Sequence, residues 1–422
     1  MRAGPVPAPG RRAGLAGLLG AVAVSDMGSK MTFVALPWLV LVSTGSPAAM
    51  GVVAAAELLP FILALALGGP LVDRLRPRRT SIVTDAASTA VVALLALSYR
   101  GGLGVVVVLV AALGALRGMG QNSKTVLLRP ATVEAGADLL RMTSVYYGVS
   151  RFSDLVFAPL GGVLIALVGI RTTIMLDAVS FALAAVIVAA MVRPGLGDPS
   201  PAGPGSSGGS YLAALGDGLR HLWRDRLLTG VFAMTFVTNM CHQANVAVFV
   251  PLWVHDVLHS PAGLGLLTGA YALGTLLGSA VFTAVAPRVS RYLVLTLGFL
   301  VGGAPRFLAV AFGDGLTAAV VAFFICGVAV SPVLSIVGAL LYERVPSPLQ
   351  ARVFGAAAAV STAGMPLGVV LGGWVAAGLG LTAAALVVGA VYVAATLAPV
   401  LGRRTWRQMD ASHAQPGLID TR

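Results

Sequence analysis

Of the 422 residues, 57% are hydrophobic and only 10% are charged, whereas about a quarter of the residues of an ordinary soluble domain are charged. This composition argues against a soluble protein and predicts a multi-pass integral protein of the cell membrane. The formal net charge of +12 does not indicate a nucleic-acid partner, because the basic residues lie in short runs between long apolar segments.

Twelve apolar segments are long enough to cross a bilayer, which needs about 20 mostly apolar residues in a helix. We expect an all-α integral membrane protein with spanning helices at residues 15–42, 49–72, 80–98, 103–126, 142–168, 172–192, 227–254, 262–286, 292–312, 316–341, 353–378 and 382–401. The 52 glycines agree with this, since small residues let membrane helices approach closely. Cys241 and Cys326 lie inside these segments, so we expect neither a disulfide framework nor a metal site.

The basic residues fall mostly on one side of the predicted membrane. If the N-terminus is cytoplasmic, most Lys and Arg residues, Lys124 among them, lie on the cytoplasmic side, and only Arg100 and Arg171 lie opposite. The positive-inside rule then places both termini in the cytoplasm. The basic residues left within the bilayer or at its edge are Lys30, Arg117, Arg151 and Arg306.

An internal duplication divides the chain. The sequence SPAAMG at residues 46–51 returns as SPAGLG at residues 260–265, and farther along Gly169 corresponds to Gly380. We predict two pseudo-symmetric six-helix halves, residues 15–192 and 227–401, with cytoplasmic segments 1–14, 193–226 and 402–422. Residues 194–210 are rich in Pro, Gly and Ser and are expected to form a flexible linker. A parallel duplication is typical of secondary transporters whose substrate site lies between the halves.

Carboxylates inside the first two segments are candidates for carrying a proton. Asp26 and Lys30 lie one turn apart on the same face of the first helix, so they either form a neutralised pair or leave Asp26 able to change its proton occupancy. Glu57 has no basic neighbour three or four positions away on its own helix. We therefore expect Glu57 to be unpaired and protonated at rest; the alternative is that it lies near the outer boundary of the membrane, where water solvates it and it has less relevance to function.

Between the second and third segments the pattern Gly69-x-Leu71-x-Asp73-Arg74 is followed by further arginines. It resembles the signature of the major facilitator superfamily, to which residues 15–401 are similar, and more loosely the proton-driven drug and siderophore exporters of that family. The resemblance implies a gating role for Asp73; the alternative is a local surface pair with an arginine, worth under ~1 kcal/mol. The gating candidates are Gly69, Asp73, Arg74, Arg78 and Arg79.

Two further patterns of that family lie in the fourth and fifth segments. Arg117 stands in an apolar stretch, LGALRGMG, where an arginine is costly and should face a partner or a cavity. Pro159, Gly161 and Gly162 resemble the Gly- and Pro-rich pattern of antiporters. They permit a bend and close helix contact, and a role in packing alone is the alternative.

Other polar residues are expected to face the transport cavity. On the fifth segment Tyr147, Arg151 and Asp154 share one face. On the seventh, NMCHQAN supplies hydrogen-bonding groups, with His242 as either a proton carrier or a helix-contact residue. Asp85 and Asp177 are expected at helix contacts, and Arg306 at the membrane edge. The proton-coupling candidates are Asp26, Glu57, Arg117 and Asp154, and the cavity candidates are Lys30, Tyr147, Arg151, Asn239, His242, Gln243 and Asn245.

Several function classes are excluded. There is no phosphate-binding loop, no HExxH zinc motif and no repeated selectivity-filter sequence, so an enzyme, an ATP-driven pump and a channel are not expected, nor is a cofactor. We predict a monomeric secondary active transporter that exports small amphipathic molecules by alternating access in exchange for protons. The alternatives are an importer or facilitator of the same fold, and a non-transporting membrane receptor.

Overall fold

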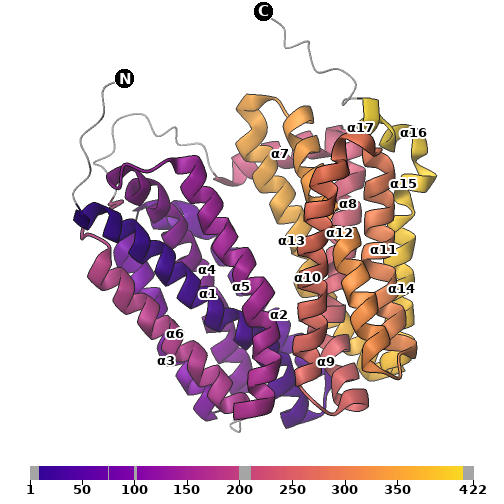
Figure 1. Cartoon of the computed structure of the whole chain (residues 1–422), viewed down its shortest axis with the longest axis horizontal. Coiled ribbons are helices and arrows are strands. Elements are labelled where there is room, and N and C mark those ends of the chain that lie inside the picture. The colour runs from indigo at the N-terminus through magenta and orange to yellow at the C-terminus, as the bar shows by residue number, and fades with distance from the viewer. Residues whose placement is uncertain (1–8, 75, 99–101, 199–210, 412–422) are drawn as a thin grey trace, which may run out of the picture. The chain divides into compact units, whose positions relative to one another are not determined.

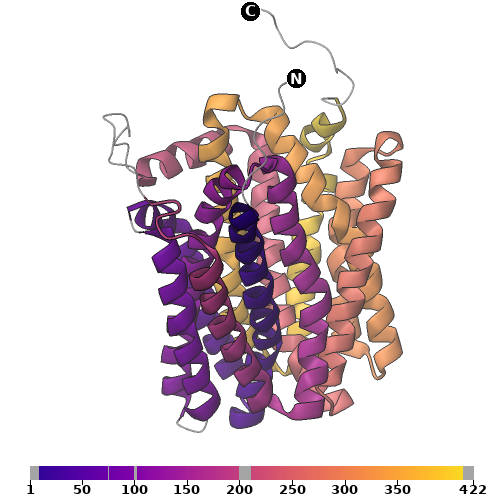
Figure 2. The same ribbon diagram turned by 60° about the vertical axis from the view of Figure 1, so that its left-hand side comes forward.

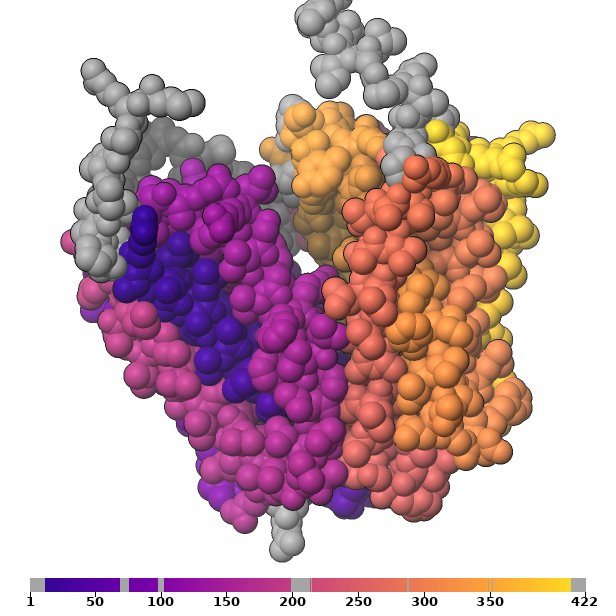
Figure 3. All heavy atoms as spheres, viewed as in Figure 1, coloured from indigo at the N-terminus to yellow at the C-terminus, as the bar shows by residue number. Residues whose placement is uncertain are grey.

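The computed structural model describes residues 9–74, 76–98, 102–198 and 211–411, and in this part of the chain the regular structure is helical. The chain forms two compact units. Unit 1 comprises Met1–Ser207 with Ser260–Gly265, and unit 2 comprises Gly208–His259 with Leu266–Arg422. Within each unit the side chains fill the spaces between neighbouring helices on the face shown in Figure 3.

Unit 1 is a bundle of six long helices (Figure 1 and Figure 2). Helix α1 packs against α5 and α6, α2 packs against α4, and α3 packs against α4 and α6. Gly169 joins α5 to α6 at a positive φ of 81°, which favours glycine. The helices are α1 (Pro9–Thr44), α2 (Pro47–Arg74), α3 (Pro77–Ser98), α4 (Leu103–Glu134), α5 (Leu139–Val168) and α6 (Ile170–Met191).

Unit 2 begins with an amphipathic helix, α7 (Tyr211–Arg224), inside the segment predicted as a cytoplasmic linker. Helix α8 packs on α13, α11 packs on α12 and α14, and α7 packs on α13. The remaining elements are α8 (Arg226–Ala244), η1 (Asn245–Phe249), α9 (Val250–Trp253), η2 (Val254–Leu258), α10 (Ala262–Val285), η3 (Ala286–Arg288), α11 (Arg291–Phe312), α12 (Leu316–Arg344), η4 (Ser347–Leu349), α13 (Gln350–Leu379), α14 (Leu381–Thr396), α15 (Ala398–Leu401), α16 (Arg403–Trp406) and α17 (Gln408–Ala411).

Eleven helices of the described residues are long and apolar enough to cross a membrane. They overlap eleven of the twelve predicted segments. The segment at 227–254 differs, because the polar run NMCHQAN lowers its hydropathy and the π-helical segment η1 interrupts it, while a second one, η2, begins at its last residue. Twelve spanning helices and cytoplasmic termini therefore stay predictions.

The two units share one detail of backbone geometry. Gly380 joins α13 to α14 with a φ of 79°, close to the 81° of Gly169. Each glycine donates its N–H to the carbonyl four residues earlier, at Ala376 and Ile165 respectively. The internal duplication read from the sequence is thus repeated in the backbone at this turn.

Candidate functional site

Arg117 of α4 forms an ion pair with Glu57 of α2 inside unit 1. Glycines bring the two helices close together: a Cβ at Gly114 would clash with the Glu57 carbonyl, and one at Gly118 would lie 2.7 Å from the Phe61 carbonyl oxygen. The side chains of Arg117 and Glu57 are only 17% and 10% exposed. The prediction of an unpaired Glu57 is therefore wrong, because its cation comes from a neighbouring helix.

Asp177 of α6 lies fully buried next to this pair. Its charge interacts electrostatically with both Arg117 and Glu57, and Thr32 of α1 lies beside it. Ser180 donates a hydrogen bond of 3.2 Å from Oγ to Asp177 Oδ1. Among the described residues no cation reaches Asp177 at ion-pair distance. We call Glu57, Arg117 and Asp177 the buried ionic group.

Gly28 of α1 explains how Asp177 comes to be covered. A Cβ at this position would lie 2.9 Å from the Asp177 Cα and closer still to Asp177 Oδ1 and Ser180 Oγ. The hydrogen of glycine therefore lets α1 lie directly on the carboxyl group. This is the helix contact expected for Asp177, but no pattern in the sequence indicates that Arg117 and Glu57 lie nearby.

One interpretation of the sequence predicted that Lys30 pairs with Asp26 on its own helix, but Lys30 pairs with a residue of another helix. Its Nζ atom lies 2.6 Å from Oδ1 of Asp154 on α5, and Arg151 Nη1 lies 3.9 Å from Oδ2 of the same carboxylate. The side chain of Arg151 is 73% exposed. Asp26 is half-buried, has no ion pair among the described residues and interacts electrostatically with Tyr146.

Tyr147 and the helix-packing residues of α5 lie along the same helix. Tyr147 is exposed and its ring meets Tyr146 edge-on, with 5.6 Å between the ring centroids. Pro159 lies within α5, and Gly161 and Gly162 are buried. A Cβ at Gly161 would lie 3.0 Å from the Met31 Cα, so this glycine permits close contact with α1.

A second buried ion pair joins α3 to α4. Lys124 Nζ lies 3.0 Å from Asp85 Oδ1, and both side chains are buried. Lys124 thus lies within α4 and neutralises a carboxylate of α3, and its place on the cytoplasmic side stays a prediction. Asp85 is at a helix contact, as expected.

The gating candidates are only partly described. The side chains of Gly69, Asp73 and Arg74 lie outside the described residues. Arg78 donates from Nε to the Val192 carbonyl at 2.7 Å and from Nη2 to the Ala189 carbonyl at 2.6 Å, so it binds carbonyls left free at the end of α6. Arg79 is exposed. A gating role for these five residues stays a prediction.

In unit 2 a buried arginine meets His242. Arg306 is 3% exposed, not at the membrane edge as expected, and its Nη1 hydrogen-bonds to His242 Nδ1. A guanidinium can only donate, so Nδ1 accepts and the imidazole is neutral with its proton on Nε2. The guanidinium also lies 5.6 Å and 5.8 Å from the ring centroids of Phe307 and Tyr392. No acidic side chain of the described residues pairs with it.

The other polar residues of the NMCHQAN run are mostly enclosed. Asn239 Nδ2 donates to the Ser361 carbonyl at 2.8 Å, which joins α8 to α13. Gln243 is buried. Asn245 is fully buried at the start of η1, and neither of its side-chain polar atoms has a partner among the described residues. Their contact with a substrate stays a prediction and requires a conformation in which they are uncovered.

The described residues contain no group of three or more His, Cys, Asp or Glu side chains that could hold a metal ion. A model of the family described as Major Facilitator Superfamily matches residues 18–264 and 239–416. The chain belongs to the major facilitator superfamily. It is a transporter of this superfamily and a multi-pass protein of the cell membrane.

Two relatives similar in sequence carry the name of a multidrug efflux pump. The chain is 30% identical over 363 residues to the "Multidrug efflux pump Tap" of Mycobacterium tuberculosis, covering 84% of this chain and 85% of the relative. It is 29% identical over 376 residues to the pump of the same name from Mycolicibacterium fortuitum, covering 87% and 90%.

Solved structures of superfamily transporters have the same fold. The crystal structure of the nucleoside transporter NupG matches with a TM-score of 0.72 at 13% identity, covering 92% of this chain and 98% of that one. A bacterial homologue of the lysosomal transporter Spinster matches with a TM-score of 0.70 at 15% identity, covering 97% and 99%. At these identities the likeness concerns the fold.

The sequence analysis missed two features of the buried polar residues in this transporter. Asp177 was not placed with the ionic residues, and Arg306 was not recognised as buried. A signal for both existed, because a charged residue deep within an apolar segment is expected to be functional or partnered. The identity of each partner depends on which helices are neighbours, and the spacing within one helix does not contain that information.

Proposed function

We propose that this transporter exports small amphipathic molecules by alternating access and that protons moving in the opposite direction drive the export. The relatives named multidrug efflux pump support export, since they align over most of the chain. The observation that supports proton coupling is the buried ionic group of unit 1, in which Arg117 pairs with Glu57 and the carboxyl group of Asp177 is buried next to the pair.

The charges of this group imply an exchangeable proton. A buried charge is tolerated only when it is paired, and one guanidinium neutralises one carboxylate. When Arg117 pairs with Glu57, the neutral, protonated form of Asp177 is favoured. A shift of Arg117 toward Asp177 would transfer the need for a proton to Glu57. The group therefore holds one proton in either arrangement, and the proton would be released in a conformation in which water reaches the group and both carboxylates can be charged.

The accessible residues near α1 and α5 are proposed to contact the substrate. Lys30, Asp154 and Arg151 form a chain of charges, and Tyr147 on the same helix offers a ring and a hydroxyl group. Asp26 is the second proton-coupling candidate, because it is half-buried and has no ion pair among the described residues. In this proposal Asp154 anchors the two cations and does not itself carry the proton.

The test is transport by purified protein in liposomes with an imposed pH gradient. Ethidium and a panel of amphipathic antibiotics serve as probes, each with and without an uncoupler. We expect Asp177→Asn and Glu57→Gln to reduce gradient-driven transport at least about tenfold, within the range of a removed proton-transfer group. Exchange of substrate across the membrane without a gradient should continue in these variants.

Asp217→Asn is the matched control, because Asp217 is an exposed residue of α7 paired with Arg352. Wild-type coupling in both Asp177→Asn and Glu57→Gln would remove the buried ionic group from the mechanism. Loss of coupling only in Asp26→Asn would transfer the role to Asp26. Uptake into intact cells driven by the inward proton gradient would show an importer and contradict export.

A further inference from the structure

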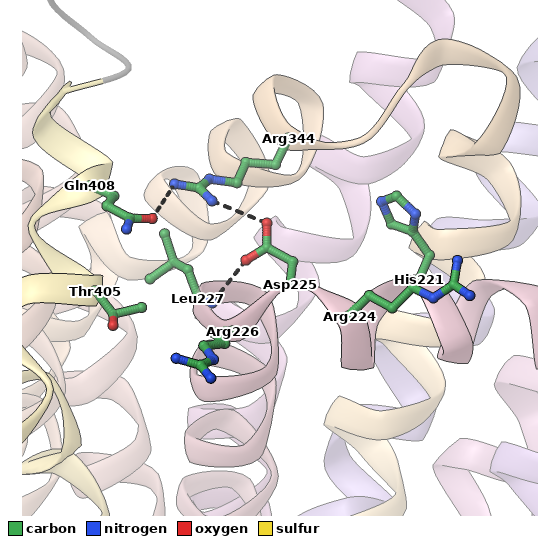
Figure 4. A pocket seen from close by; sticks show the side chains of 8 residues that line it. All are labelled: His221, Arg224, Asp225, Arg226, Leu227, Arg344, Thr405 and Gln408. Carbon is green, nitrogen blue, oxygen red and sulfur yellow. Dashed lines mark hydrogen bonds and ion pairs between the residues drawn. The ribbon is translucent and has the colours of Figure 1, made fainter.

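Arg306 is a buried cation of unit 2 for which the described residues supply no counter-charge. Other arginines of this unit are paired: Arg291 Nη1 lies 2.8 Å from Glu343 Oε1. Arg344 donates from Nη1 to Asp225 Oδ2 at 3.1 Å, as a dashed line of Figure 4 shows. No acidic side chain of the described residues forms such a pair with Arg306. Since a buried charge is costly without a partner, an anion from outside the chain would stabilise this arginine.

Neutral groups from four other helices surround the guanidinium. His242 of α8 accepts a hydrogen bond from Nη1, and the side chain of Tyr271 of α10 is also hydrogen-bonded to Arg306. Cys326 of α12 and Tyr392 of α14 interact with it electrostatically. Thiols and phenols are uncharged at neutral pH, so these neighbours hold the guanidinium in place and leave its charge uncompensated.

Close packing of α14 on α11 fixes one side of this arrangement. A Cβ at Gly303 would overlap the ring of Tyr392, so glycine lets this ring lie against α11 one turn before Arg306. The Tyr392 hydroxyl donates to the Phe299 carbonyl at 2.6 Å, which holds the ring there. The guanidinium lies 5.8 Å from the centroid of this ring. Arg306 is thus held in a fixed position, as a preorganised binding group must be.

Some hydrogen-bonding groups of this region are unused. The guanidinium fork of an arginine matches the two oxygens of a carboxylate. The Nε atom of Arg306 is buried and has no hydrogen-bond partner among the described residues. Asn245, three positions after His242 and therefore on the same helix face, is buried with an equally unpartnered side-chain amide. These groups add hydrogen-bond donors to the unbalanced positive charge.

We propose that Arg306 binds the carboxylate of the transported molecule, so that the substrates of this protein are amphipathic organic anions or zwitterions. The inference rests on the proposed function, since it assigns a chemical class to the exported molecules. The carboxylate supplies the negative charge that unit 2 lacks at this position.

Access to Arg306 requires a movement of α8. The π-helical segment η1 starts at Asn245, directly after the end of α8 at Ala244, and interrupts the regular helix close to His242. Kinks in helices commonly occur at such π-helical turns. In this proposal a bend there carries His242 away from Arg306 and opens the guanidinium to the substrate.

Binding to the purified full-length protein in detergent tests the proposal. The probes are fusidate and norfloxacin, each beside its methyl ester, whose carboxyl group carries no charge. We expect the wild type to bind at least one acid about tenfold more tightly than its ester, the usual worth of a charge-assisted hydrogen bond. This preference should disappear in Arg306→Gln and Arg306→Met and remain in Arg306→Lys, which keeps the charge. Partition of the esters into micelles is the same for every variant and cancels in the comparison.

The matched control is Arg226→Gln, which removes an exposed guanidinium at the start of α8 (Figure 4) and should leave the preference unchanged. An equal preference in the wild type and in a monodisperse Arg306→Gln or Arg306→Met protein would overturn the proposal, as would a wild type that favours neither acid. If chloride protects the wild type against heat as well as the acids do, and Arg306→Gln loses this protection, the site is for an inorganic anion and the assignment is wrong. These measurements need no proton gradient, so their failure is distinct from a failure of proton-driven export.

Discussion

Ionisable residues buried in the two bundles have three different kinds of surroundings. Glu57 and Arg117 form a direct ion pair, whereas Asp177 is fully buried and accepts a hydrogen bond from the Ser180 hydroxyl group. Arg306 has no acidic partner among the described residues and lies between a neutral histidine and two aromatic rings. Contact with an aromatic face offsets part of the cost of burying a cation, by about 2 kcal/mol when desolvated.

Gly28 allows helix α1 to pack directly on Asp177. We predict that Gly28→Ala destabilises the protein by about 1–3 kcal/mol, the range for overpacking, because its Cβ would meet the Asp177 Cα at 2.9 Å. The measurement is the fraction of protein that remains monodisperse after heating in detergent. Gly20→Ala on the same helix is the control, since a Cβ there meets nothing within 4 Å. Equal stability of the two variants would contradict this packing.

At the scale of elements, helix ends are set by local side chains and helix contacts by small residues. Asp138, Asp225 and Ser290 cap the starts of α5, α8 and α11. The π-helical segments η1 and η2 follow α8, and η1 begins at the fully buried Asn245. Because π-helical turns often occur at functional sites, this stretch of the seventh predicted segment is where we expect α8 to bend during transport.

The cap of α8 makes a prediction about acid stability. Burial raises the pKa of Asp225, but hydrogen bonds from the Leu228 N–H, Arg344 and the Leu227 N–H outweigh this effect, so the net pKa is lowered. A lowered pKa in the folded state means that the stabilisation is present above the unfolded pKa of about 3.9. It is lost as the pH falls below about 4 and through the lower pKa of the folded state.

We therefore expect Asp225→Ala to destabilise the neutral-pH protein by about 1 kcal/mol, the usual value of a lost N-cap. Asp225→Asn should keep the N-cap hydrogen bonds but lose the pH-dependent part of the stabilisation, because an amide does not titrate. Thermal unfolding in detergent between pH 3 and pH 7 measures both effects. An acid dependence of Asp225→Asn identical to that of the wild type would assign it to other carboxylates.

At the scale of the whole molecule, the two units repeat one backbone pattern with different chemistry. Gly169 and Gly380 make the same turn with nearly the same φ. The buried ionic group with two carboxylates lies in unit 1, while the buried charge of the NMCHQAN region in unit 2 is the cation Arg306. The duplication therefore preserved the helix connections and left the side chains free to diverge.

The orientation of the molecule in the membrane is open to a direct test. The positive-inside rule predicts that residue 171 faces the outside and residue 79 the cytoplasm. In a background without Cys241 and Cys326, both buried, we expect a membrane-impermeant maleimide to label Arg171→Cys in intact cells. Arg79→Cys should react only after permeabilisation, and Arg220→Cys on α7 serves as a second cytoplasmic position. The reverse labelling pattern would invert the predicted topology.

The sequence by itself determined the class of protein, its family and its internal repeat, because apolar length, basic loops and the motif at Gly69–Arg74 are local properties of the chain. It also marked Arg117 as a residue that needs a partner. The tertiary structure decided which partner: Glu57 is 60 positions away, and Lys30 meets Asp154 of another helix instead of its neighbour Asp26. Helical periodicity shows which residues share a face, but the contact between two faces is set by how side chains and glycines of different helices pack.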